Sequence, residues 1–188
     1  MERANNFAAV ILAGGKSSRM GKNKALLKIN NKYIIEIIAE KLRKITPNIF
    51  ISSNSLDLDF LPYKKIEDII KNCGPICGIY SALKNLPYEK IIITPCDSPF
   101  IPIDIFKMLL QQNTNTWISY KKRINPLIGI YYKTITSIIK QHIDNKNFKL
   151  LHLSPYFKII NIKNLPEYTF LNINYPEDYQ RAIQLSKR

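Results

Sequence analysis

The stretch that decides the fold is AAVILAGGKSSRMGKNKALL, residues 8–27. It starts as an apolar run, turns at the pair Gly14 and Gly15, and continues into a series of lysine and arginine side chains. A glycine loop between a strand and a helix often binds phosphate, because backbone N–H groups can approach the anion where no Cβ obstructs them. The stretch therefore predicts a buried strand followed by a phosphate-binding loop.

Short apolar runs recur along the chain and predict further strands. The expected strands cover residues 7–13, 48–53, 88–95, 115–120, 127–132 and 157–162. Segments with helical periodicity lie between several of them, and the expected helices cover residues 34–45, 75–86, 101–112 and 175–187. This alternation favours an α/β fold with a mostly parallel, Rossmann-like sheet and helices on both faces, in which ligands bind at the carboxyl ends of the strands.

Length and charge narrow the classes of function. The chain has 188 residues without a repeat or a Gly/Ser linker, so we expect a single domain, residues 1–188. Its 28 Lys and Arg against 14 Asp and Glu give a formal net charge of +14, which suits anionic partners. The lysines are scattered from Lys16 to Lys187, however, whereas a nucleic-acid binder concentrates its charge. We expect no nucleic-acid partner, and a basic non-catalytic nucleic-acid binder is the alternative from a different class.

The cysteines and the hydropathy pattern bear on the compartment. Cys73, Cys77 and Cys96 are odd in number, and neither their spacing nor the distant histidines match a zinc site. We expect buried, reduced thiols. No apolar run is as long as a membrane span, and the first residues lack a processing site. The expected location is the cytoplasm, without a membrane partner.

The loop motif is neither of the two common nucleotide signatures. A P-loop needs a glycine at position 10, which is Val10, and the glycines do not fit G-x-G-x-x-G. The pattern L-A-G-G, then Arg19-Met20-Gly21, then Lys24 resembles the nucleotidyltransferases, and most closely the molybdenum cofactor guanylyltransferases, whose loop reads L-A-G-G-x-S-x-R-M-G-x-x-K. The resemblance covers Phe7 to Leu185 and includes IEDIIKNCGPICGIYSAL (66–83), TPCDSPFIP (94–102) and FLNINYPEDY (170–179). The sequence departs from this pattern at Ser52, Ile76, Cys77, Asn125 and Tyr175.

The resemblance implies a fold like that of the nucleotide-diphospho-sugar transferases and a specific reaction. GMP would pass from Mg-GTP to the terminal phosphate of molybdenum-loaded molybdopterin, with release of pyrophosphate, and the proteins that insert molybdenum or mature molybdoenzymes would be partners. The implied catalytic residues are Arg19, Lys24 and Asp97, and Asp97 is the implied ligand of Mg²⁺. The implied nucleotide-binding residues are Leu12, Ala13, Gly14, Gly15, Lys24, Asp68, Asp97, Asn172 and Asn174.

The residues themselves support some of these roles and leave others open. Asp97 follows an expected strand, and Mg²⁺ prefers carboxylate and phosphate oxygens, although an aspartate before Ser98 and Pro99 also suits a turn cap. Asp68 fits a helix cap or a solvated loop acid about as well as it fits the nucleotide contact that the resemblance implies. Asn172 and Asn174 would point to one side of a short strand, or serve as polar turn residues.

Three functions remain in view. GMP transfer is the leading hypothesis, and a cytidylyltransferase or another NTP transferase of the same superfamily is the alternative within the class. The nucleic-acid binder is the third. Ser52 and Asn54 lie near the expected end of a strand, and the sequence assigns neither of them a role.

Overall fold

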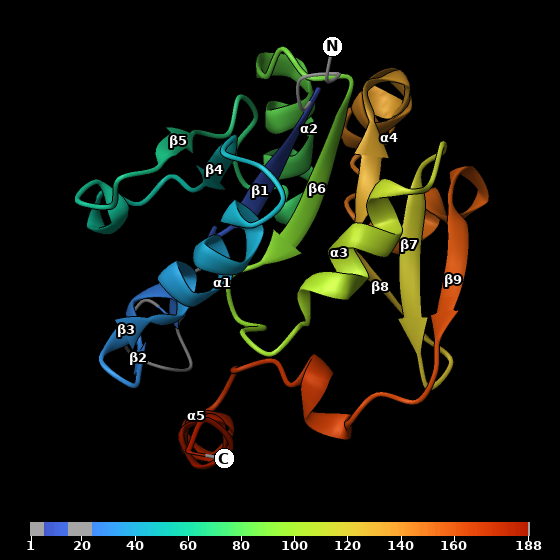
Figure 1. Ribbon diagram of the computed structural model, residues 1–188. Helices are drawn as coiled ribbons and strands as arrows, with labels where there is room; N and C mark the ends of the chain where they lie inside the picture. Colours follow the sequence, from blue (N-terminus) through green and yellow to red (C-terminus); the bar gives the residue numbers. More distant parts are fainter. Residues whose placement is uncertain (1–5, 15–23, 188) are drawn as a thin grey trace, which may run out of the picture.

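The computed structural model describes residues 6–14 and 24–187, which form one mixed, mostly parallel sheet between two layers of helices (Figure 1). The sheet has seven strands in the order β5-β4-β1-β6-β8-β7-β9. β1 pairs in parallel with β4 and β6, and β4 pairs in parallel with β5. β8 is antiparallel to both β6 and β7, and β7 is parallel to β9. The expected α/β fold class is confirmed.

The strands and helices have the following bounds. The strands of this sheet are β1 (Phe7–Leu12), β4 (Ile49–Ser52), β5 (Lys64–Ile66), β6 (Lys90–Pro95), β7 (Thr116–Tyr120), β8 (Arg123–Tyr132) and β9 (Lys158–Ile162). The α-helices are α1 (Ile34–Arg43), α2 (Pro75–Asn85), α3 (Ile103–Leu110), α4 (Thr136–Asp144) and α5 (Pro176–Leu185). A small separate hairpin is formed by β2 (Lys28–Ile29) and β3 (Lys32–Tyr33).

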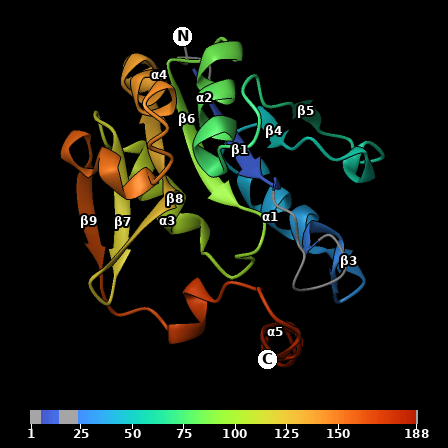
Figure 2. The same cartoon turned by 180° about the vertical axis from the view of Figure 1, so that it is seen from behind.

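The two faces of β1 explain why its sequence is apolar throughout. Ala9 and Ile11 pack into a core cluster with α1 and α3, whereas Ala8, Val10 and Leu12 pack into a second cluster with α2 and α4. Figures 1 and 2 show these helix pairs on opposite faces of the sheet. A strand that is covered on both faces has no solvent side to place polar residues on.

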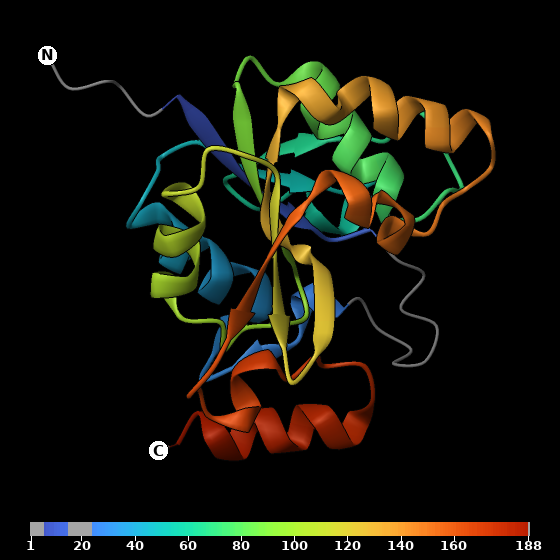
Figure 3. The same ribbon diagram turned by 90° about the vertical axis from the view of Figure 1, so that its right-hand side faces the viewer.

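The carboxyl ends of β1, β4, β5 and β6 meet at one edge of the sheet. Leu12 is level with Ser52 on one side and with Pro95 on the other, and Ser52 is level with Ile66. Each of the four segments that leave this edge therefore starts beside the next. Helix α5 lies beyond the ends of the strands, at the bottom of Figure 3.

Several short elements differ from the sequence expectations. The sequence did not predict β5, the β2–β3 hairpin or α4. The hairpin turns through Asn30 and Asn31, both with positive φ, which asparagine tolerates better than most residues. The strand expected around Asn172 and Asn174 is absent, because Ile173 bonds to the loop after β6 and not to a neighbouring strand.

The expectation of reduced thiols is wrong for two of the three cysteines. Cys73 and Cys77 form a disulfide with their Cα atoms 5.7 Å apart, and Cys96 is free. The turn at Gly74, which has a φ of 70°, reverses the chain before α2 and brings the two sulfurs together. No helix in the described ranges is long and apolar enough to cross a membrane.

Candidate active site

The first part of the site is the loop that leaves β1. The Ala13 N–H donates to the Ser52 carbonyl (2.9 Å), and the Leu12 carbonyl accepts from the Cys96 N–H (3.1 Å). These bonds continue the sheet for one residue beyond β1. A Cβ added to the exposed Gly14 would meet no described atom within 4 Å, so this glycine faces open space. The predicted residues Gly15 and Arg19 lie outside the described residues.

Lys24 returns the chain to this edge of the sheet. It starts the short helix η1 (Lys24–Leu26), and its Nζ donates to the Asn174 Oδ1, a residue 150 positions further along the chain. Burial raises the pKa of the Asp97 carboxyl, and the positive charge of Lys24 opposes part of that rise. Two of the predicted catalytic residues are thus brought within electrostatic range of each other.

Asp97 lies in the loop after β6 and is largely buried. Burial raises its pKa above the ordinary value, and the Ser98 hydroxyl and the Lys24 charge offset part of this effect. The Ser98 Oγ is 2.7 Å from the Asn172 Oδ1 and 3.1 Å from the Asp97 Oδ1. Because a hydroxyl has one hydrogen, it donates to one of these oxygens at a time.

The segment before α5 completes this part of the site. The Ile173 N–H donates to the Asp97 carbonyl (2.9 Å), and the Ile173 side chain is fully buried. The Asp178 carboxylate accepts from the N–H groups of Asn174 (3.0 Å) and Tyr175 (2.9 Å). These bonds fix the backbone on both sides of Asn174. Asn172 contacts Ser98 and Asn174 contacts Lys24, both from an irregular segment and not from the expected strand.

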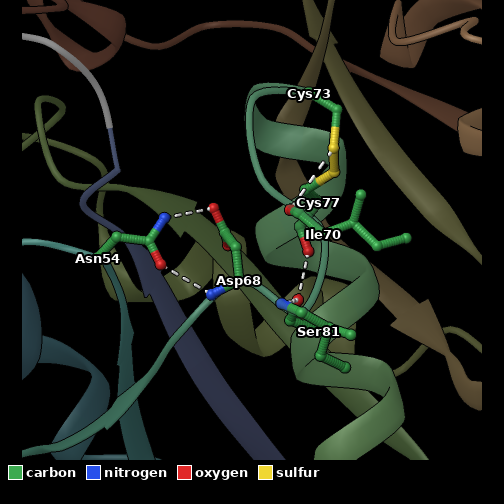
Figure 4. The surroundings of a disulfide bond; sticks show 7 residues. Asn54, Asp68, Ile70, Cys73, Cys77 and Ser81 are labelled. Carbon is green, nitrogen blue, oxygen red and sulfur yellow. Dashed lines mark hydrogen bonds between the residues drawn. A yellow bond between two sulfur atoms is a disulfide. The ribbon is translucent and has the colours of Figure 1, made fainter.

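Asp68 lies on the neighbouring side, past the end of β5 (Figure 4). The Asn54 amide donates to the Asp68 Oδ2 (2.8 Å) and accepts from the Asp68 N–H (2.9 Å). Burial raises the pKa of Asp68, and the Asn54 hydrogen bond works against that shift. The next residue, Ile69, donates its N–H to the Ser81 Oγ on α2 (2.9 Å), and Ser81 donates to the Cys77 carbonyl (2.8 Å).

Gly78 allows α2 to approach this side closely. A Cβ at this position would lie 2.5 Å from the Ser52 Oγ, 3.3 Å from a Leu12 methyl carbon and 3.5 Å from the Asp68 Oδ1. The first distance is shorter than real Cβ contacts allow. Gly78 therefore lets the ends of β1 and β4, the Asp68 carboxylate and α2 share one corner.

Sequence reasoning missed three of these residues, namely Asn54, Gly78 and Ser98. Ser98 is adjacent to Asp97, and Asn54 lies two residues after the end of β4, so their positions hinted at the site. Their partners, however, depend on how the loops fold over the sheet edge. The only sequence signal for a role of Gly78 is its position in the G-P-I-C-G segment.

The residues present fit a single Mg²⁺ that is held mainly by its substrate. No group of three or more His, Cys, Asp and Glu side chains that could hold a metal occurs in the part of the chain described here. Mg²⁺ is commonly bound by one or two carboxylates together with phosphate oxygens and water. The Asp97 carboxylate, within electrostatic range of the Lys24 charge, meets that requirement.

Two comparisons with known proteins show the family, and a third shows the fold. The model of the MobA-like NTP transferase domain matches residues 9–154. A protein of Carboxydothermus hydrogenoformans named "probable molybdenum cofactor guanylyltransferase" is 37% identical over 96% of both chains. A protein of the same name from Flavobacterium johnsoniae is 36% identical over 95% of both. The crystal structure of molybdopterin-guanine dinucleotide biosynthesis protein A from Archaeoglobus fulgidus superposes with a TM-score of 0.80 at 20% identity, over 96% of this chain and 98% of that one.

Proposed function

The chain belongs to the family of MobA-like NTP transferases, and from this premise we propose that it transfers GMP from GTP to the terminal phosphate of molybdenum-loaded molybdopterin, releasing pyrophosphate. The observation that carries the proposal is the meeting of Lys24, Asp97 and Asn174 where β1 and β6 end. They come from the beginning, middle and end of the sequence. Together they place a cation, a carboxylate and an amide beside the loop that starts at Gly14.

The reaction requires positioning and charge neutralisation more than proton transfer. An oxygen of the acceptor phosphate forms a bond to the α-phosphorus of GTP, and the bond from that phosphorus to the oxygen bridging to the β-phosphate breaks. The pyrophosphate leaves with the bonding electron pair. Because the attacking phosphate is already ionised, it needs no general base, but the two anions must be aligned against their repulsion.

The side chains of this site suit that task. Lys24 meets the triphosphate as a compact positive charge, and Asn174 orients its ammonium group. Asp97 would hold Mg²⁺, which supplies positive charge to the phosphate oxygens when it is bound. Asn172 contributes indirectly, because its side-chain oxygen accepts a hydrogen bond from the hydroxyl of Ser98, the residue after Asp97. Arg19 and Gly15 remain predicted members of the phosphate loop.

The start of the loop contributes in a more limited way than the sequence suggests. Leu12 and Ala13 are at most 8% exposed, and the Ala13 N–H is used by the Ser52 carbonyl. Any contact that these two residues make with the nucleotide is therefore through other backbone atoms. Gly14, which follows these sheet contacts, is the first described residue that can turn its amide toward a phosphate.

The Asp68 corner supports guanine over cytosine. Guanine presents neighbouring N–H donors on its pairing edge, and an ionised carboxylate is a pure acceptor. Asn54 occupies one oxygen of Asp68, the Oδ2, and thereby holds the carboxylate in one orientation. The Oδ1 lies toward Gly78 and the end of β1, on the side where the phosphate loop begins. Cytosine offers a single amino donor there and would leave the carboxylate less well satisfied.

A panel of nucleoside triphosphates tests the proposal directly. The purified protein is given Mg²⁺, molybdenum-loaded molybdopterin and each NTP in turn, and pyrophosphate release is measured. We expect turnover with GTP and little with CTP, UTP or ATP. Comparable turnover with CTP would reassign the chain to the cytidylyltransferases. Duplex binding that persists at physiological salt, without turnover, would support the nucleic-acid binder instead.

The proposed function also implies a location, substrates and protein partners for the enzyme. We place it in the cytoplasm with GTP and the molybdenum-loaded pterin as substrates. The proteins that insert molybdenum and those that mature molybdoenzymes are the proposed protein partners, because the pterin must be passed from one to the other.

A further inference from the structure

Lys41 is a largely buried lysine that the proposed reaction does not use. It lies on α1, and its ammonium group points into the loop that joins β6 to α3. The Nζ donates to the carbonyl oxygens of Pro99 and Ile101, the second at 3.2 Å. These two residues follow Asp97 by two and four positions. Lys41 thus contacts the backbone of the loop that carries Asp97, the proposed metal ligand.

The loop depends on outside donors for its carbonyl groups. Ser98 and Ile101 are at most 2% exposed, and a buried carbonyl without a partner is costly. The Asp97 carbonyl is bonded by the Ile173 N–H (2.9 Å), and the Pro102 carbonyl by the Ile105 N–H (3.2 Å). Between them, Lys41 supplies the donors for the carbonyls of Pro99 and Ile101. The loop is therefore held in place by two segments that are far from it in sequence, α1 and the C-terminal segment.

A lysine is an expensive way to make these two bonds. Burial, together with the smaller effect of the nearby Lys44 charge, lowers the pKa of Lys41 to about 8. Its acceptors are neutral carbonyls, so the bonds provide no full counter-charge for the ammonium. A side chain chosen for stability alone would be apolar at this position, with the loop carbonyls turned elsewhere. Side chains kept in such unfavourable surroundings are found preferentially at functional sites.

We propose that Lys41 is a positioning residue for nucleotidyl transfer, which fixes the 97–102 loop so that the Asp97 carboxylate is held ready for the metal and the phosphates. The role rests on the proposed function, because it requires Asp97 to act in the reaction. Lys41 touches neither substrate. It acts on the reaction through the backbone of the loop, together with the Ile173 N–H on the other side.

Three variants separate positioning from simple stability. Lys41→Met keeps the aliphatic stem and removes the donors, whereas Lys41→Arg keeps a cation that can donate to two carbonyls. Lys44→Met is the matched control, because it removes a charge from the exposed end of the same helix and leaves both loop bonds in place. If the methionine variant does not fold, Lys41→Gln replaces it, since the shorter amide weakens the contact without burying an apolar tip under the carbonyls.

Two measurements are made on each variant. The first is pyrophosphate release, from which kcat, the KM for GTP and the Mg²⁺ concentration for half-maximal rate are obtained. The second is amide hydrogen exchange of the peptide that contains Ser98, Phe100 and Ile101, which needs no substrate. For Lys41→Met we expect kcat to fall about 10- to 100-fold, the Mg²⁺ requirement to rise, the KM for GTP to stay near wild type and the loop amides to exchange faster. Lys41→Arg should recover part of kcat, and Lys44→Met should match the wild type.

Each outcome decides between the two claims. Wild-type kcat and Mg²⁺ dependence in folded Lys41→Met overturn the positioning role, whether or not the loop exchanges faster. If exchange is unchanged while kcat falls, the loop is not what Lys41 fixes, and the proposal is also wrong. A wild-type protein that is inactive with GTP and molybdopterin contradicts the proposed function, and unchanged exchange in the variant would then separately refute the hold on the loop.

Discussion

Two aspartates at the same edge of the sheet, Asp97 after β6 and Asp68 after β5, are held in contrasting ways. Both are partly buried, and burial raises the pKa of both. The groups around Asp97 come from distant parts of the chain. Asn172, for example, accepts a hydrogen bond from the Ser98 hydroxyl, 74 residues away. Asp68 is bonded to Asn54, 14 residues away, and its neighbour Ile69 to Ser81, 12 residues away.

This difference separates a site that needs the whole fold from one that is built locally. The Asp97 surroundings include Ile173 and Asn174 of the C-terminal segment, which lies beyond the carboxyl ends of β1 and β6 (Figure 1). The Asp68 surroundings lie between β4 and α2, within one β-loop-helix unit. If phosphate chemistry belongs to Asp97 and base choice to Asp68, then base choice resides in a unit that can change without disturbing the chemistry.

The largest effect is expected from Asp97→Asn, which keeps the shape of the side chain and removes its charge. If Asp97 holds Mg²⁺, the rate of pyrophosphate release should fall about 100- to 1000-fold, as it does when one main charge-stabilising group is lost. A turn-capping aspartate would tolerate asparagine in both rate and stability. The measurement is a Mg²⁺ titration of turnover, and a near-wild-type rate with unchanged Mg²⁺ dependence contradicts the metal assignment.

The same variant also makes a prediction about stability against pH. Because burial raises the folded-state pKa of Asp97 above its ordinary value, the charged form is penalised as pH rises from about 3.8 through that raised pKa. The penalty is absent in acid and is complete once the pH has passed the raised pKa. Asp97→Asn should therefore melt at or above the wild-type temperature at pH 7. A clear loss of stability at pH 7 would mean that the carboxylate mainly supports the fold.

A smaller and different effect is expected from Asp68→Ala. Removing an acceptor for a base donor typically changes discrimination by about 10-fold. The KM for GTP should rise and the ratio of kcat/KM for GTP to that for CTP should fall, while kcat with saturating GTP stays near wild type. Asn54→Ala, which removes only the partner of Asp68, should move the ratio in the same direction by less. A fall in kcat without a change in base preference would erase the distinction between the two aspartates.

The sequence could predict the frame of the site but not its internal contacts. The strand ends that carry Asp97 and the phosphate loop follow from apolar runs, and the unbroken apolar sequence of β1 requires helices on both faces. The three-residue strand β5 was missed because KKI, with two lysines, carries almost no periodicity. Short edge strands depend on their neighbour for their identity, and here the neighbour is β4.

The partners of the predicted residues were beyond reach for a related reason. That Lys24 would meet Asn174 depends on where the chain goes between residues 163 and 176, a stretch with one short 3-10 helix and no strand. Lys41 lies three residues after Ile38 and four before Ile45, so helical periodicity places it on the apolar face of α1. Its carbonyl partners depend on how closely α1 packs beside the 97–102 loop, which periodicity does not encode.

The smallest effect is expected from removal of the Cys73–Cys77 disulfide. This change tests whether the Asp68 side of the site is independent of the Asp97 side. The bond closes a loop of a few residues at the start of α2, and by loop-closure entropy it contributes about 2 kcal/mol at most to the free energy of unfolding. The variant with both Cys73→Ser and Cys77→Ser should melt a few degrees lower. Its KM for GTP should change by less than that of Asp68→Ala, since Asn54 and Ser81 still hold Asp68 and Ile69. Its kcat should be unchanged, because no group that contacts Asp97 comes from the 69–77 segment.

A dithiol reductant should reproduce these changes in the wild type and have no effect on the double variant, which is the control for reduction elsewhere. Alkylation of the unfolded, unreduced protein followed by mass spectrometry counts the free thiols, and three labelled cysteines would contradict the disulfide. A large loss of kcat in the double variant would show that the two sides of the site are mechanically coupled, against the separation drawn between Asp97 and Asp68.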